Sequence, residues 1–148
     1  MLMGEFHHNI DDKGRLIIPS KFRYELGEKF IITRGLDKCL SIYSLSEWDK
    51  LTGNLNTLSL LTRDARAFSR FYTSSAAECE FDRQGRINIT SPLVSYADLT
   101  KECVIIGAND RLEIWSKDNW NQYLNTNADN IADIAENLFK TTGDYETL

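Results

Sequence analysis

The residues best suited to chemistry in this 148-residue chain are two aspartate–arginine pairs with the same spacing. Asp11 and Arg15 lie in Asp-Asp-Lys-Gly-Arg, and Asp82 and Arg86 lie in Asp-Arg-Gln-Gly-Arg. An arginine guanidinium can bind guanine or phosphate through two parallel hydrogen bonds, and a neighbouring carboxylate can fix its orientation. The pairs therefore predict one of two arrangements. Each arginine reaches outward to a nucleic acid, or it folds back on its aspartate and ties a turn.

The two pairs belong to a longer duplication. They are related by an offset of 71 residues (82 − 11), and apolar residues follow each pair at alternate positions, Leu16 and Ile18 in one copy and Ile87 and Ile89 in the other. Two repeats are too few for a solenoid, and each is too small for a comfortable core of its own. We therefore expect one intertwined core.

The elements around the first pair follow from alternation and turn residues. Residues 6–10 alternate apolar and polar side chains, as a half-buried strand does, and residues 16–18 form a second apolar strand before Pro19. Between them, residues 11–14 predict the turn of a β-hairpin with Lys13 and Gly14 near its tip, because glycine accepts positive φ there. Ser20 is then expected to cap a short helix over residues 21–26.

The remaining pattern predicts an α+β chain. Further strands are expected over residues 30–33, 40–43, 76–81, 86–89, 102–106 and 112–115, and helices over 92–96 and from Ser46 and Lys117. Residues 55–72 carry apolar side chains at three- and four-residue spacings, which predicts one amphipathic helix linking the halves. The tail from Asn125 is weakly helical and is the expected place for fraying.

The charge is acidic overall but unevenly distributed. The net charge is −5, which taken alone argues against nucleic acid, because DNA affinity comes from cations that neutralise phosphates. Residues 13–34 nevertheless hold six basic and two acidic side chains, a charge of +4, whereas residues 110–148 hold three basic and eight acidic, a charge of −5. The chain can therefore have a basic working face and an acidic back.

Other classes of protein find little support. Cys39, Cys79 and Cys103 are widely spaced and odd in number, which favours reduced thiols in a cytoplasm over disulfides or a zinc site. No apolar run reaches the ~18 residues of a membrane span. The sequence has no nucleophile motif, no metal-spaced His/Cys set and no glycine-rich phosphate loop, so no catalytic residue, metal or cofactor is expected.

The two Asp-x-x-x-Arg signatures, each followed by a strand and a later apolar hairpin ending in Tyr43 or Trp115, resemble the MraZ family, which is related to AbrB- and MazE-type DNA-binding domains. The resemblance covers residues 1 to about 140. It implies a double-split β-barrel made from two swapped-hairpin repeats. The implied segments are a first repeat over 5–48, a linking helix over 49–75, a second repeat over 76–120, and a C-terminal helix and tail over 121–148.

The resemblance also implies a transcriptional regulator of the bacterial division and cell-wall gene cluster. Such a protein would be cytoplasmic and nucleoid-associated, and would bind repeated promoter sites on double-stranded DNA as a homo-oligomeric ring. Carried onto this sequence, the DNA-binding residues are Lys13, Gly14, Arg15, Arg83 and Arg86, with Asp11 and Asp82 as orienting acids. The second copy departs from the family pattern at Gln84 and Thr90, so the first hairpin is the stronger predicted contact. The alternative is a protein-interaction scaffold without DNA binding, which the acidic C-terminal part supports.

Overall fold

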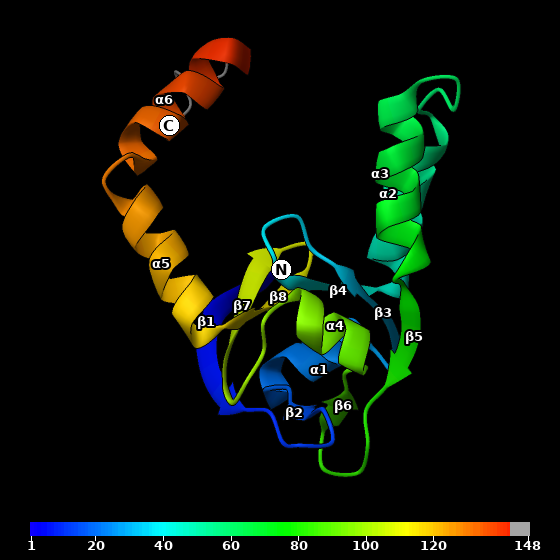
Figure 1. Ribbon diagram of the computed structural model, residues 1–148, viewed down its shortest axis with the longest axis vertical. Coiled ribbons are helices and arrows are strands. Elements are labelled where there is room, and N and C mark those ends of the chain that lie inside the picture. The colour runs from blue at the N-terminus through cyan, green and yellow to red at the C-terminus, as the bar shows by residue number, and fades with distance from the viewer. Residues whose placement is uncertain (143–148) are drawn as a thin grey trace. The chain divides into compact units, whose positions relative to one another are not determined.

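The computed structural model describes residues 1–142, and it divides into two compact units, Met1–Lys117 and Asp118–Leu148. The first unit is a mixed α/β structure (Figure 1). Its strands are β1 (Leu2–Asn9), β2 (Arg15–Ile17), β3 (Lys29–Arg34), β4 (Leu40–Ser44), β5 (Ala77–Glu80), β6 (Arg86–Asn88), β7 (Glu102–Asn109) and β8 (Leu112–Ser116). Its helices are α1 (Ser20–Leu26), α2 (Leu45–Asn56), α3 (Arg63–Ser74) and α4 (Ser91–Tyr96).

The strands form two antiparallel sheets. Six strands pair in the order β1-β7-β8-β4-β3-β5, and β2 pairs with β6 in a separate two-stranded ribbon. Four of the ladders, β1 with β7, β2 with β6, β4 with β8 and β3 with β5, join the first half of the chain to the second. The expectation of one intertwined core is therefore confirmed for the first unit.

The expected local hairpin of the first signature is wrong. β1 pairs with β7, from Leu2 opposite Asn109 to Asn9 opposite Glu102, whereas β2 pairs with β6. The turn between β1 and β2 does form, but the strands on either side of it then diverge to partners in the other repeat. Alternation identifies a strand without identifying its partner, which is why the sequence suggested the nearest one.

Apolar side chains from both repeats share one core. Leu16, Ile18 and Phe22 of the first repeat and Ile87 and Ile89 of the second are all at most 2% exposed and belong to the same buried cluster. These residues flank the two signatures directly. Both turns are therefore anchored by the same core, and residues of both repeats are needed to form that core.

The segment linking the halves contains two helices where the sequence predicts one. α2 ends at Asn56 and α3 starts at Arg63, with Thr62 at its N-cap, where the threonine hydroxyl accepts a hydrogen bond from the Ala65 amide at 3.3 Å. Leu58 and Leu61, which the apolar spacing placed on a buried face, are 43% and 92% exposed. The short helix expected over residues 92–96 is confirmed as α4, which spans Ser91–Tyr96. Ser20 does not cap α1, whose N-cap position is Pro19.

The second unit is helical as far as it is described. It holds most of α5 (Lys117–Ala128) and α6 (Ile131–Thr142), and none of its side chains between residues 118 and 140 is buried. Part of the predicted C-terminal tail, residues 143–148, lies outside the described residues. Within residues 1–142 no helix combines the length and the apolarity that crossing a membrane requires.

Candidate nucleic-acid interface

The first signature forms a tight turn in which Gly14 has φ +81°. The Gly14 amide donates to the Asp11 carbonyl at 3.0 Å, and the Asp11 amide donates to the Arg15 carbonyl at 3.0 Å. A non-glycine residue adopts this left-handed conformation only at a cost, so the glycine sets the shape of the turn. The turn leads directly into β2, which starts at Arg15.

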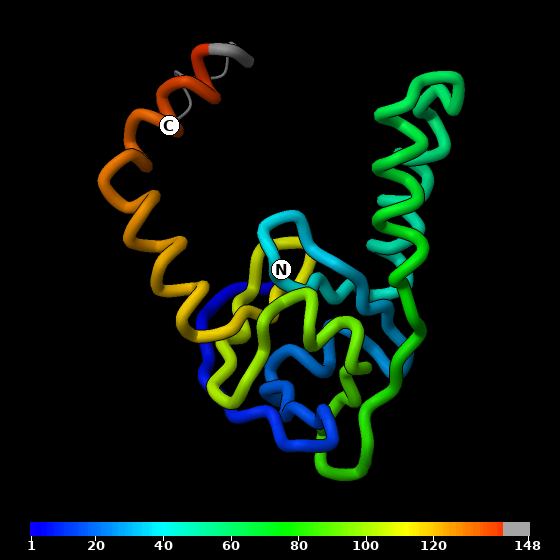
Figure 2. Tube along the Cα trace, in the orientation of Figure 1, coloured from blue at the N-terminus to red at the C-terminus, as the bar shows by residue number. Residues whose placement is uncertain are grey.

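The second signature repeats this geometry closely. Gly85 has φ +76°, its amide donates to the Asp82 carbonyl at 3.0 Å, and the Asp82 amide donates to the Arg86 carbonyl at 2.9 Å. Figure 2 shows the two turns, in blue and in green, at the lower end of the first unit. The sequence duplication is therefore a structural one at the candidate site.

Each aspartate binds its own turn and its own arginine. One oxygen of Asp11, Oδ1, accepts from the amides of Lys13 at 3.0 Å and Arg15 at 2.8 Å, and the other, Oδ2, accepts from the Arg15 side-chain Nε at 2.7 Å. Asp82 does the same with the amides of Gln84 and Arg86, both at 2.9 Å, and with Arg86 Nε at 2.7 Å. Of the two arrangements that the sequence allowed, the structure therefore has the one in which each arginine folds back on its aspartate and ties the turn.

This contact uses only one edge of each guanidinium. Within residues 1–142 the terminal Nη groups of Arg15 and Arg86 make no hydrogen bond or ion pair. A guanidinium held by Nε keeps donors for a second, outward partner, and its orientation is already fixed. Folding back and binding an external acceptor are therefore compatible.

The same hydrogen bonds lower the pKa of both aspartates. For Asp11 the largest cause is the backbone amide of Arg15, and for Asp82 it is the backbone amide of Arg86, with further lowering by the two guanidinium groups. Both carboxylates are thus ionised throughout the neutral range, which is the state that holds an arginine.

The ribbon brings the two arginines onto one face. In the β2–β6 register Arg15 lies opposite Asn88 and Ile17 lies opposite Arg86, while Leu16 lies opposite Ile87. Directly opposed residues of an antiparallel pair share a face, and residues two apart along a strand do as well. Because Leu16 and Ile87 are buried, the four residues Arg15, Ile17, Arg86 and Asn88 form the outward side, which we call the ribbon face.

One hydrogen bond connects each turn to the other repeat. The Ile89 amide donates to the Gly14 carbonyl at 2.7 Å, and the Ile18 amide donates to the Gly85 carbonyl at 3.1 Å. Because the ribbon is antiparallel, the turns flank it at its two ends. Residues 71 apart in sequence thereby become one continuous surface.

The predicted site residues all lie on this surface or in its turns. Lys13 and Arg83 are exposed in the two turns, Arg15 and Arg86 are half-buried on the ribbon face, and Gly85 is buried. Sequence reasoning missed Asn88, whose place opposite Arg15 depends on the pairing of strands from different repeats. It also missed Arg23 of α1, whose guanidinium lies against Gly85.

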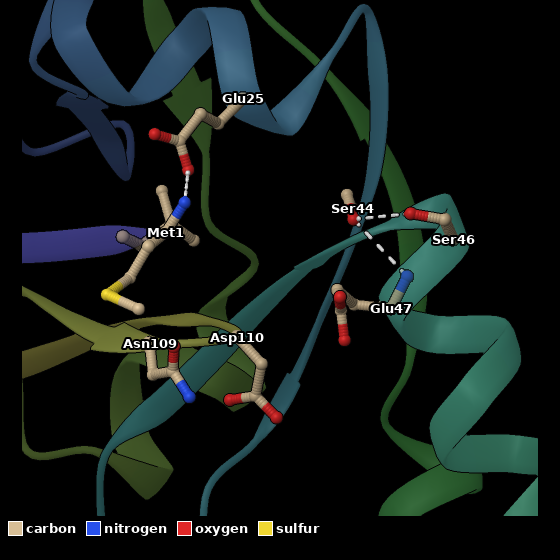
Figure 3. A pocket seen from close by; sticks show the side chains of 8 residues that line it. Met1, Glu25, Ser44, Ser46, Glu47, Asn109 and Asp110 are labelled. Carbon is tan, nitrogen blue, oxygen red and sulfur yellow. Dashed lines mark hydrogen bonds and ion pairs between the residues drawn. The ribbon is translucent and has the colours of Figure 1, made fainter.

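A pocket away from the ribbon face is lined by acidic side chains, in contrast to the arginines of that face. Its volume is about 750 Å³, and Glu25, Glu47 and Asp110 line it (Figure 3). The amino group of Met1 contacts Glu25 at 3.1 Å. Carboxylates repel phosphate, and the pocket shares no residue with the ribbon face or its turns. The first unit therefore separates an acidic surface from the arginine-bearing one.

Two of the three cysteines are buried among the described residues, and burial makes their thiols unreactive. Burial raises the pKa of Cys39 to about 12 and that of Cys103 to about 11, so both thiols stay protonated at neutral pH. Residues 1–142 contain no group of three or more His, Cys, Asp or Glu side chains placed to hold a metal ion.

The fold and the site define a duplicated α/β protein whose two halves contribute equivalent aspartate–arginine turns to one surface. The family described as "MraZ protein" matches this chain twice, over residues 1–71 and 73–142. Two proteins named "Transcriptional regulator MraZ", from Limosilactobacillus reuteri strain DSM 20016 and from L. reuteri subsp. reuteri strain JCM 1112, are each 58% identical to it over 138 residues. That match covers 93% of this chain and 97% of each relative. The chain belongs to the MraZ family.

Proposed function

We propose that this protein is a transcriptional regulator that binds specific sites on double-stranded DNA through the ribbon face and its two turns. The observation that carries the proposal is the common placement of Arg15 and Arg86, each oriented by an aspartate and each with free Nη groups among the described residues. The relatives' name, transcriptional regulator, supports the same function.

In this proposal the residues divide the work by chemistry. A two-stranded β-ribbon fits the DNA major groove, where arginine pairs with guanine O6 and N7. Arg15 and Arg86 bind base edges or phosphates, and Lys13 and Arg83, exposed in the turns, add charge for the backbone. Gly14 and Gly85 shape the turns, and Asp11 and Asp82 hold the arginines in place before binding.

We infer further that several subunits act together, as a ring on repeated promoter sites. β2 and β6 have only three residues each, and specific protein–DNA interfaces bury roughly 1,000 Å² of protein surface or more. A ring would present ribbons at regular intervals and raise affinity through effective concentration. The regulated genes in this proposal are those of division and cell-wall synthesis, and the protein acts in the cytoplasm at the nucleoid.

The proposed architecture is a double-split β-barrel of two swapped-hairpin repeats, residues 5–48 and 76–120. The pairing of β2 with β6 supports it, because each signature strand finds its partner in the other repeat. In a barrel of this kind the ribbon is one of the ladders that join the repeats, and the DNA-binding surface exists only when both repeats are folded together.

The acidic pocket favours a second candidate, a protein-interaction scaffold without DNA binding. Three carboxylates around one pocket suit a basic partner better than a nucleic acid. The salt dependence of DNA affinity distinguishes the two functions. A protein that binds a duplex releases the counterions condensed on it, so its DNA affinity falls as salt rises.

The test is a fluorescence-anisotropy titration of a labelled duplex from the chain's own upstream promoter region at 50 and 200 mM salt. The DNA-binding function predicts an affinity that falls steeply with salt, and a loss of about 1–3 kcal/mol for Arg15→Ala or Arg86→Ala. Lys50→Ala, at an exposed α2 position, serves as the control for removal of one cation. Salt-independent or undetectable binding would favour the scaffold.

A further inference from the structure

The two turns differ in the residue that the neighbouring helix of the other repeat places beside them. A Cβ atom at Gly85 would collide with the guanidinium of Arg23, which fills the space beside the second turn. The same offset of 71 relates Arg23 in α1 to Val94 in α4 (94 − 71 = 23). Val94 lines a cavity of about 290 Å³ beside the first turn, together with Asp12, Lys13 and Gly14.

Arg23 is held in an unusual state for a cation. Its Nε is the one buried side-chain nitrogen or oxygen in residues 1–142 that has no hydrogen-bond partner, and the side chain as a whole is only partly buried. An unpaired buried donor costs free energy, so its presence in a folded protein needs an explanation. Arg23 makes no ion pair within the described residues.

The position of Arg23 changes the charge balance between the turns. Residues 11–15 contain Asp11, Asp12, Lys13 and Arg15, which sum to zero. Residues 82–86 contain Asp82, Arg83 and Arg86, a charge of +1, and Arg23 raises the charge around the second turn to +2. The second turn has Gln84 where the first has Lys13, and it has a cation of the first repeat, Arg23, against its glycine.

We propose that Arg23 is a DNA-phosphate contact of the second turn, supplied across the repeats by α1. This inference rests on the proposed function. Its guanidinium lies against Gly85, which has no side chain to keep it away and which directly precedes Arg86 of the ribbon face. A phosphate contact positions the ribbon and carries no base preference, so Arg23 adds affinity for all sequences equally.

The test compares Arg23→Met, which keeps the length and the apolar stem, with Arg23→Lys, which keeps the charge. Both are titrated against the promoter duplex between 50 and 200 mM salt, with Lys50→Met as the matched loss of a cation elsewhere. For each DNA-bound subunit, Arg23→Met should reduce the slope of log affinity against log salt by about 0.9, so that its defect is about 3.5-fold larger at 50 than at 200 mM. Arg23→Lys should keep the parental slope, as should Lys50→Met.

The proposal is overturned if Arg23→Met keeps the parental slope of log affinity against log salt. If Arg23→Met and Arg23→Lys then also lose the same amount of affinity, Arg23 acts in packing alone. Arg23→Gln also removes the charge and replaces Arg23→Met in the same comparison if the latter unfolds. Failure of the parent protein to bind DNA refutes the proposed function. If the parent protein binds DNA and Arg23→Met binds it with the same affinity and salt slope, only the Arg23 contact is refuted.

Discussion

The carbonyl of Gly14, in the turn of the first signature, accepts a 2.7 Å hydrogen bond from the amide of Ile89, which follows the second signature. Its counterpart runs from the Ile18 amide to the Gly85 carbonyl. Each turn is therefore completed by the other repeat. Loss of pairing between the repeats would remove the support of both turns together, which makes the candidate interface a property of the whole first unit.

The two turn glycines should differ in their tolerance of alanine. A Cβ at Gly14 would meet the backbone carbonyl of Ile89, which cannot withdraw without disturbing the turn, whereas at Gly85 it would meet the movable end of Arg23. Both glycines have positive φ, so each alanine variant loses about 1 kcal/mol or more. Urea unfolding should show a larger loss for Gly14→Ala. An equal or larger loss for Gly85→Ala would contradict this account of the turns.

Acid should remove the stabilisation that the turn aspartates provide. Their folded-state pKa values lie below the ordinary 3.8, so their contribution is complete above that pH and is lost as the pH falls through the lowered values. The difference in urea midpoint between the parent and an Asp11→Asn/Asp82→Asn variant should be full at pH 6 and should shrink progressively below pH 3.8. Asp49→Asn, an exposed change in α2, controls for lost charge. A pH-independent difference would count against the prediction.

The two faces of the ribbon predict opposite sensitivities to truncation. Leu16 is fully buried opposite Ile87, whereas its neighbour Ile17 is 41% exposed on the ribbon face. Leu16→Ala should cost about 2–5 kcal/mol of unfolding free energy, because it removes packed apolar contacts and leaves a cavity. Ile17→Ala is the matched control and should cost much less. Thermal and urea unfolding measure both, and similar losses would show that the assigned inward side is wrong.

Local features of the site could be read from the sequence, because short-range chemistry determines them. The Asp-to-Arg spacing and the turn glycines, Gly14 and Gly85, have the expected geometry. The partners of the strands could not be read, because alternation in β1 is satisfied by β7 as well as by β2. The sequence also did not indicate that the linking segment is interrupted before α3. Leu61 matches the apolar spacing of a single helix, but it is exposed, and Thr62 beside it is the N-cap of a new helix.

The ranking of the two turns also depends on the fold. From the sequence, Lys13 favours the first turn and Gln84 weakens the second, and that ranking stays a prediction. The contact between Arg23 and Gly85 adds a cation to the second turn that no local pattern contains. Contacts between distant residues therefore decide how charge is distributed over a surface built from two repeats.

The central claim is that Arg15 and Arg86 bind DNA together from one face of the ribbon. The most direct measurement is footprinting of the chain's own upstream promoter region with the parent protein and with an Arg15→Ala/Arg86→Ala variant whose unfolding midpoint matches the parent. The account predicts evenly spaced protected repeats for the parent and none for the variant at the same concentration. Absence of protection by the parent, or an unchanged footprint with the variant, would contradict it.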